Sequence, residues 1–62
     1  MLTTKEAARI IYVEPQTIRS YIRNGTGKEN EKLKAIQIRH GRRLEYRIKG
    51  EDLEYYRKKY LQ

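Results

Sequence analysis

The chain has 62 residues, a net charge of +7 at pH 7 and no cysteine. This length allows one domain, residues 1–62, with one small core, and the basic charge favours a polyanionic partner. With no cysteine and a single histidine, the sequence excludes a disulfide framework and a zinc site, and we expect no metal, cofactor or small-molecule ligand. No apolar run approaches the roughly 20 residues of a membrane span, and residues 1–11 lack a signal-peptide core, so we expect no membrane association and a cytoplasmic location.

A first helix is predicted from residue 3 to about residue 12. Thr3 is a suitable N-cap, and Glu6 three residues later completes a capping box. Leu2 precedes the cap and is expected to pack on Ala7 as a hydrophobic staple. At about 100° per residue, one side of the helix is apolar and is expected to face the core: Ala7, Ala8, Ile10 and Ile11.

A second helix is predicted to begin at Pro15, which suits a first helical position, and to end at Asn24-Gly25. Its apolar stripe is Ile18, Tyr21 and Ile22, and its other sides carry Gln16, Thr17, Arg19, Ser20 and Arg23. Two short helices separated by about three residues form a helix-turn-helix pattern. Gln, Arg, Ser and Thr are side chains that read base edges, although the same residues also suit an ordinary solvent-facing helix.

Residues 24–32 are polar and contain two glycines, which predicts a mobile loop. After it, residues 33–38 and 44–48 alternate with period two and predict two strands. We expect residues 39–43, "RHGRR", to form a hairpin loop of about five residues, with Gly41 at a positive φ. Residues 39–49 hold five basic side chains against one acidic one, a balance of +4, and this clustering favours a binding surface.

The last segment, residues 49–62, is predicted to form a third helix. Acidic residues come first and basic residues last, which matches the helix dipole. Leu53, Tyr56 and Tyr60 form its inward stripe, and Tyr55 points elsewhere. The elements are therefore a helix, a turn, a helix, a loop, a hairpin and a helix.

The segments "LTTKEAARI", "VEPQTIRSYIRNG", "LKAIQI", "GRRLEYRI" and "EDLEYY" in this order resemble the excisionase-type, MerR-like DNA-binding family over nearly the whole chain. The resemblance implies an α+β winged helix-turn-helix, with a two-stranded antiparallel hairpin as the wing and a C-terminal helix. It also implies that the second helix lies in the major groove of double-stranded DNA and that the wing contacts phosphates or the adjacent minor groove.

Site residues follow from the resemblance by position. The recognition-helix contacts to the major groove are Gln16, Thr17, Arg19, Ser20 and Arg23. The wing contacts are Arg39, His40, Gly41, Arg42 and Arg43. Phosphate contacts at the first helix start, where backbone N–H groups are free, are Thr3, Thr4 and Lys5. The chain departs from the family pattern at Tyr12, where glycine is common, and in the loop 24–32, which is longer than usual.

Two functions within DNA binding stay open. The favoured one is an excisionase, a recombination directionality factor of a mobile element that bends DNA and assists an integrase or transposase. The other is a small transcriptional repressor of the MerR-like type. The end of the chain after the third helix favours the first, because a MerR-type activator continues into a dimerisation helix and an effector domain. A single module covers about 600–1,000 Å² of protein surface on DNA, so we expect cooperative copies or a DNA-bound partner, with Tyr55 and the loop 24–32 as candidate contact surfaces.

Other classes of function fit less well. "HGRR" followed by Tyr46 superficially resembles a tyrosine recombinase, but a hairpin in so short a chain cannot enclose a catalytic cleft, and we expect no enzymatic activity. Six tyrosines suit a single-strand stacking platform, yet four of them lie in apolar phase and are expected in the core: Tyr21, Tyr46, Tyr56 and Tyr60. His40 is expected to be a turn residue, or a phosphate contact when protonated. A basic protein–protein adaptor remains the alternative from another class.

Overall fold

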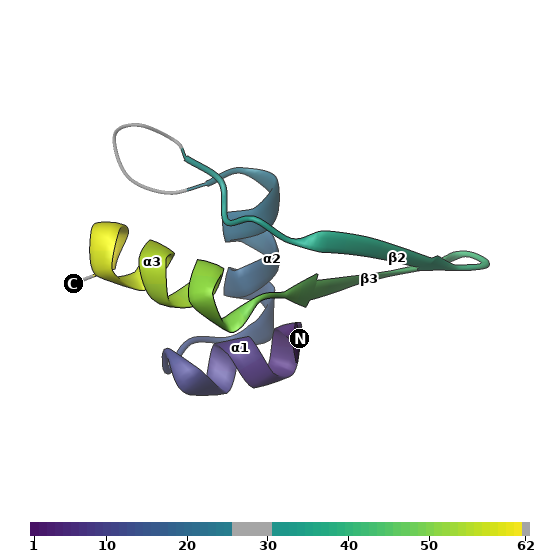
Figure 1. The fold of residues 1–62 in the computed structure, drawn as a ribbon. Helices are drawn as coiled ribbons and strands as arrows, with labels where there is room; N and C mark the ends of the chain where they lie inside the picture. The colour runs from purple at the N-terminus through teal and green to yellow at the C-terminus, as the bar shows by residue number, and fades with distance from the viewer. Residues whose placement is uncertain (26–30, 62) are drawn as a thin grey trace.

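The computed structural model describes residues 1–25 and 31–61, so residues 26–30 of the predicted loop 24–32 lie outside the described residues. The elements in chain order are β1 (Leu2–Thr3), α1 (Thr4–Ile10), α2 (Pro15–Arg23), β2 (Ile36–His40), β3 (Arg43–Ile48) and α3 (Gly50–Tyr60). The three helices gather at one end and the β2–β3 hairpin projects from them (Figure 1). The predicted α+β winged helix-turn-helix is confirmed.

The capping box that begins α1 is present. The Glu6 N–H donates to Thr3 Oγ1 at 3.1 Å, and the Thr3 N–H donates to Glu6 Oε1 at 2.9 Å. The hydrogen bond from the Thr3 backbone to the carboxylate, assisted by the Thr3 side chain, favours the ionised form and holds the pKa of Glu6 below its usual value. The prediction that Ile10 faces the core is wrong, since 49% of it is exposed. On so short a helix the buried face centres on Ala7 and Ala8, and Ile10 lies at its margin.

Helix α2 has the predicted bounds. Pro15 is its first residue, and the Thr17 and Ile18 N–H groups donate to the carbonyl of Glu14 at 2.9 and 3.3 Å. At the other end Gly25 has a φ of +79°, the left-handed conformation that ends many helices. Local signals therefore determine both ends of α2.

The sheet has three antiparallel strands in the order β1-β3-β2, where the sequence predicted only the two of the hairpin. The added strand pairs Leu2 with Ile48 and Thr3 with Arg47. The predicted five-residue loop is also wrong, because pairing continues to His40 opposite Arg43. Gly41 and Arg42 alone connect the strands, and Gly41 has the expected positive φ, +59°. A positive φ at the first central position is typical of a type II′ hairpin turn.

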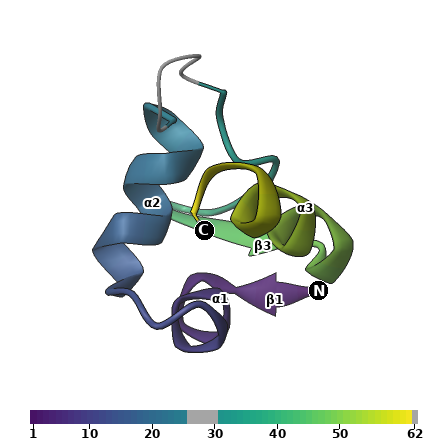
Figure 2. The same cartoon turned by 90° about the vertical axis from the view of Figure 1, so that its left-hand side faces the viewer.

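The core lies where α1, α2, α3 and the base of β3 meet. Its buried residues are Ala7, Ala8, Ile18, Leu33, Ile48, Leu53 and Tyr56. Helices α2 and α3 flank it on opposite sides, with α1 beneath (Figure 2). Of the four tyrosines expected in the core, Tyr56 lies in the core cluster, Tyr21 and Tyr60 pack partly buried against it, and Tyr46 is buried but lies outside the cluster.

Tyr56 ties the chain after the predicted loop to α3. Its hydroxyl donates to the Glu31 carbonyl at 2.9 Å, and its ring lies 5.6 Å from that of Tyr21. Nearby, the Leu33 N–H donates to the Tyr21 carbonyl at 3.1 Å. These contacts hold the segment that leads into β2 against α2 and α3, which fixes where the hairpin begins.

The turn between α1 and α2 contains a strained residue. Tyr12 has a φ of +59°, while 94% of it is exposed. The turn is closed by the Val13 N–H, which donates to the Ala8 carbonyl at 2.9 Å. The left-handed backbone conformation is about 1–2 kcal/mol less favourable for a residue with a Cβ. Because the Tyr12 side chain is exposed, its packing does not offset this strain. The departure from glycine at this position therefore weakens the fold.

Replacing Tyr12 with asparagine relieves this strain, because asparagine adopts the left-handed region more readily. We expect Tyr12→Asn to raise the free energy of unfolding by about 0.5–1 kcal/mol, measured by urea denaturation. Tyr12→Phe is the matched control and should leave stability unchanged, since the backbone strain is the same. An asparagine variant no more stable than the phenylalanine variant would contradict the strain assignment.

Candidate nucleic-acid interface

Helix α2 presents a polar face away from the core. Ile18 is fully buried and sets the inward direction of the helix. At about 100° per residue, Gln16, Ser20 and Arg23 lie on the side of the helix opposite to Ile18 and therefore point outward. Of the five predicted recognition-helix residues, Thr17 is half-buried and the other four are exposed: Gln16, Arg19, Ser20 and Arg23.

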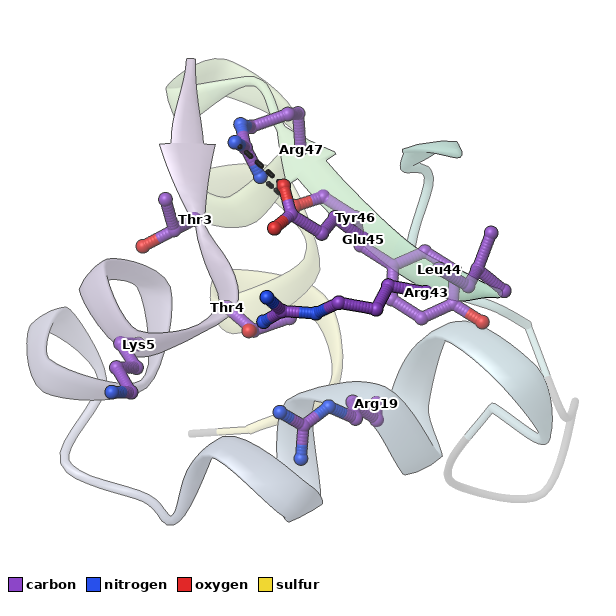
Figure 3. A pocket seen from close by; sticks show the side chains of 9 residues that line it. All are labelled: Thr3, Thr4, Lys5, Arg19, Arg43, Leu44, Glu45, Tyr46 and Arg47. Atoms are coloured by element: carbon purple, nitrogen blue, oxygen red, sulfur yellow. Dashed lines mark hydrogen bonds and ion pairs between the residues drawn. The ribbon is translucent and has the colours of Figure 1, made fainter. Parts of the chain in front are cut away.

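A groove of about 310 Å³ lies beside this helix, between α2, the start of α1 and β3. We call it the cationic groove. Its lining residues are Thr3, Thr4, Lys5, Arg19, Arg43, Leu44, Glu45, Tyr46 and Arg47. Arg43 extends from β3 toward Thr4, and Arg19 lies on α2 on the facing side (Figure 3). Segments far apart in the sequence therefore contribute basic side chains to one hollow.

The short length of β1 creates the groove. Strand β1 pairs with Arg47 and Ile48 only, so within the described strands the rest of β3 has no partner on that side. Thr3 ends the strand and also caps α1, which turns the chain away from β3 at this point. The start of α1 and the unpaired edge of β3 form two walls of the hollow, and α2 closes it.

The groove is electropositive. Four basic side chains line it, and Glu45 is the one acidic side chain among the lining residues. Glu45 Oε2 lies 3.0 Å from Arg47 Nη2 and 3.7 Å from His40 Nε2. Arg47 also donates from Nη1 to the Tyr46 carbonyl at 3.2 Å. Among the described residues, no carboxylate pairs with the other three basic side chains of the groove: Lys5, Arg19 and Arg43.

The five predicted wing residues do not share one surface. His40 and Arg43 are cross-strand partners, so their side chains lie on one face of the hairpin. Arg39 is paired with Leu44, which places both on the opposite face. Gly41 and Arg42 form the exposed turn. Of the predicted wing residues, Arg43 alone lines the cationic groove.

The three residues predicted at the start of α1 all line the groove, but they are not equally available. The Thr3 hydroxyl accepts from the Glu6 N–H and the Thr3 N–H donates to the Glu6 carboxylate, so the capping box uses two of the backbone N–H groups expected to be free there. Thr4 and Lys5 form no such side-chain contact in the described part of the chain. Thr4 and Lys5 are thus the side chains that this helix start offers to a ligand.

Sequence reasoning assigned no site role to Glu45, Tyr46 or Arg47. Glu45 and Arg47 lie within the charged cluster 39–49 that the sequence analysis described. The period-two pattern predicted that Tyr46 is buried, and the structure confirms this, since 5% of it is exposed. The contact between Tyr46 and α2 had no sequence signal: the Arg23 Nε–H donates to the Tyr46 hydroxyl at 3.4 Å. This hydrogen bond links the last residue of α2 to the wing.

Tyr55, a predicted contact surface, lies on α3 and is not among the residues that line the cationic groove; Figure 2 shows the position of α3. It is 56% exposed. Its hydroxyl accepts a hydrogen bond from Lys59 Nζ at 3.2 Å, which raises the pKa of Lys59, and Lys59 Nζ lies 3.5 Å from Glu31 Oε1. Tyr55 is therefore separate from the cationic groove.

Comparison with known proteins gives one match. The family model described as "Helix-turn-helix domain" matches residues 1–60, nearly the whole chain, and supports DNA binding. No curated protein and no solved structure matches the chain. No helix in residues 1–25 or 31–61 is long and apolar enough to cross a membrane.

Proposed function

This chain belongs to the helix-turn-helix domain family, and we propose that it binds double-stranded DNA sequence-specifically, with α2 in the major groove and the β2–β3 wing on the backbone or in the adjacent minor groove. One observation carries the proposal: unpaired basic side chains from α1, α2 and β3 converge on one groove beside the exposed face of α2. Such a surface matches a ligand that has regularly spaced negative charges beside readable base edges.

The exposed face of α2 supplies the groups for base reading. The Gln16 amide can both donate and accept, as adenine requires, and it lies in the first turn of the helix. Arg23 offers paired N–H donors that suit guanine, and Ser20 suits either base edges or phosphate. Thr17 is half-buried, so its role is a contact to a phosphate at the edge of the DNA major groove rather than a base contact.

The cationic groove supplies most of the affinity. Lys5, Arg19 and Arg43 bind backbone phosphates, with the Thr4 hydroxyl as a further donor. Because these cations have no carboxylate partner among the described residues, no internal ion pair must break when phosphate arrives. Arg42 extends the positive surface to the exposed two-residue turn, and Arg39 adds a positive charge on the other face of the wing. His40 lies near Glu45 and contributes to the wing rather than to the groove.

Within DNA binding we assign the chain to the excisionase role, in which it bends DNA and assists an integrase or transposase. The resemblance of its ordered motifs to excisionase-type proteins supports this role. Interface size supports it as well, because one module buries about 600–1,000 Å² and needs adjacent copies or a DNA-bound partner for useful selectivity. A small transcriptional repressor uses the same contacts and is the alternative outcome of the tests.

Removing the Arg43 charge tests the phosphate-binding groove. We expect Arg43→Gln to weaken binding to selected and random duplexes alike and to reduce the slope of log affinity against log salt by about one, because one phosphate contact is lost. Lys58→Gln removes the same charge from α3 and should change the slope much less. The groove assignment fails if the two variants have equal salt slopes.

Removing the Gln16 amide tests base reading. Against a duplex that the wild-type protein selects from a random pool, Gln16→Ala should bind about 5- to 100-fold more weakly, because a two-hydrogen-bond base contact is lost. Affinity for unselected DNA should stay the same. Gln37→Ala, on the wing, is the control and should keep the discrimination of the wild type. A Gln16→Ala protein that still discriminates fully would rule out this reading of α2.

The excisionase role makes its own prediction. Bound to a selected duplex with dyes at both ends, the protein should shorten the end-to-end distance measured by energy transfer. Where an integrase is encoded beside its gene, adding the protein to that integrase should also raise the yield of excised product. Repression of a nearby promoter without bending or any effect on excision would establish the repressor alternative instead.

A further inference from the structure

Tyr46 occupies an unusual position for a buried tyrosine. It is 5% exposed, but it lies outside the contiguous core cluster that contains Ile48, its neighbour on the same face of β3. Instead it lines the cationic groove, between the wing and α2 (Figure 3). Packing in the groove wall needs only the ring, so the hydroxyl calls for a separate explanation.

The hydroxyl is used by the recognition helix. The Arg23 Nε–H donates to it at 3.4 Å, and no carboxylate of the described residues pairs with Arg23. A guanidinium is planar and carries five N–H donors, of which this contact uses one. Fixing Nε restricts the plane of the group and leaves the four donors on Nη1 and Nη2 for a ligand.

We propose that Tyr46 is a positioning residue that holds the Arg23 guanidinium in the orientation in which it reads a guanine edge. The inference rests on the proposed function, since it assumes that α2 enters the major groove. Arginine recognises guanine with two parallel hydrogen bonds to O6 and N7, a geometry that a freely rotating side chain adopts only part of the time. Prior orientation lowers the side-chain entropy lost on binding.

The same contact couples the wing to the recognition helix. Arg23 is the last residue of α2, and Tyr46 lies in the middle of β3. A shift of the wing against α2 changes the distance between Nε and the hydroxyl and thereby the direction of the guanidinium. Base discrimination by Arg23 therefore depends on a residue that need not touch a base.

Tyr46→Phe tests this role, because it removes the hydroxyl and keeps the ring. We expect affinity for the duplex selected by the wild-type protein to fall about three- to tenfold, the value of one hydrogen bond, and affinity for the unselected pool to change less than twofold. Tyr55→Phe, which removes a hydroxyl from α3, is the matched control and should change neither. A thermal melt establishes that each variant is folded.

Two readouts separate positioning from a structural role. In the free protein, the NMR order parameter of the Arg23 Nε–H should fall in Tyr46→Phe and stay unchanged in Tyr55→Phe. In an Arg23→Ala background, Tyr46→Phe should cause no further loss of affinity for the selected duplex. If Tyr46→Phe does not fold, the wild type decides alone: an order parameter of the Arg23 Nε–H as low as that of the exposed Arg19 Nε–H would overturn the positioning role, and a clearly higher one would support it.

The outcomes distinguish this inference from the proposed function. If the wild type binds no duplex, the proposed function fails and the positioning role fails with it. If the wild type discriminates but Tyr46→Phe binds the selected duplex equally well, only the positioning role is overturned. An additive loss in the Arg23→Ala background overturns it too, since Tyr46 would then act independently of Arg23.

Discussion

The pairing of β1 with the base of β3 is the constraint on which the rest of the molecule depends. Leu2 opposite Ile48 places the chain start against a fully buried core residue, and Thr3 opposite Arg47 brings the start of α1 beside the wing. Thr3 then serves as the N-cap of α1, so one residue ends the strand and begins the helix. A longer β1 would cover the edge of β3 that now forms a wall of the cationic groove.

Charge and core are kept apart in this small fold. Within the described residues the buried set is wholly apolar, apart from tyrosine hydroxyls that form hydrogen bonds. Lys5, Arg19 and Arg43 gather like charges in one groove, with no carboxylate partner among the described residues, and repulsion within such a concentration of charge opposes folding. A bound polyanion removes it and stabilises the folded state by linkage. The feature that weakens the isolated chain is therefore the one that favours its complex.

The sequence predicts this fold well where local signals decide it. The cap at Thr3 and the Pro15 and Gly25 boundaries of α2 depend on neighbouring residues alone. The period-two pattern correctly predicts that Tyr46 is buried, although Leu44 in the same phase is exposed. The sequence does not predict β1, because two residues carry no periodicity, nor the two-residue turn, because arginines fit strand and loop alike. The groove escapes prediction for a different reason: it exists only once distant segments are in contact. Residue types thus identify Arg19 and Arg43 as separate candidate DNA contacts, and the tertiary structure places both in one groove.

In a simple division of labour, the wing supplies affinity and the recognition helix supplies specificity. The hydrogen bond from Arg23 to Tyr46 blurs that division, since a wing residue holds a side chain of the helix. A module this small has few base contacts, so each must lose little entropy on binding to be useful. The hydrogen bond to Tyr46 on β3 restricts the Arg23 side chain without any additional residues. Under the proposed positioning of Arg23 by Tyr46, the wing contributes to specificity through the orientation of Arg23, and substitutions in the wing and in α2 should not be additive.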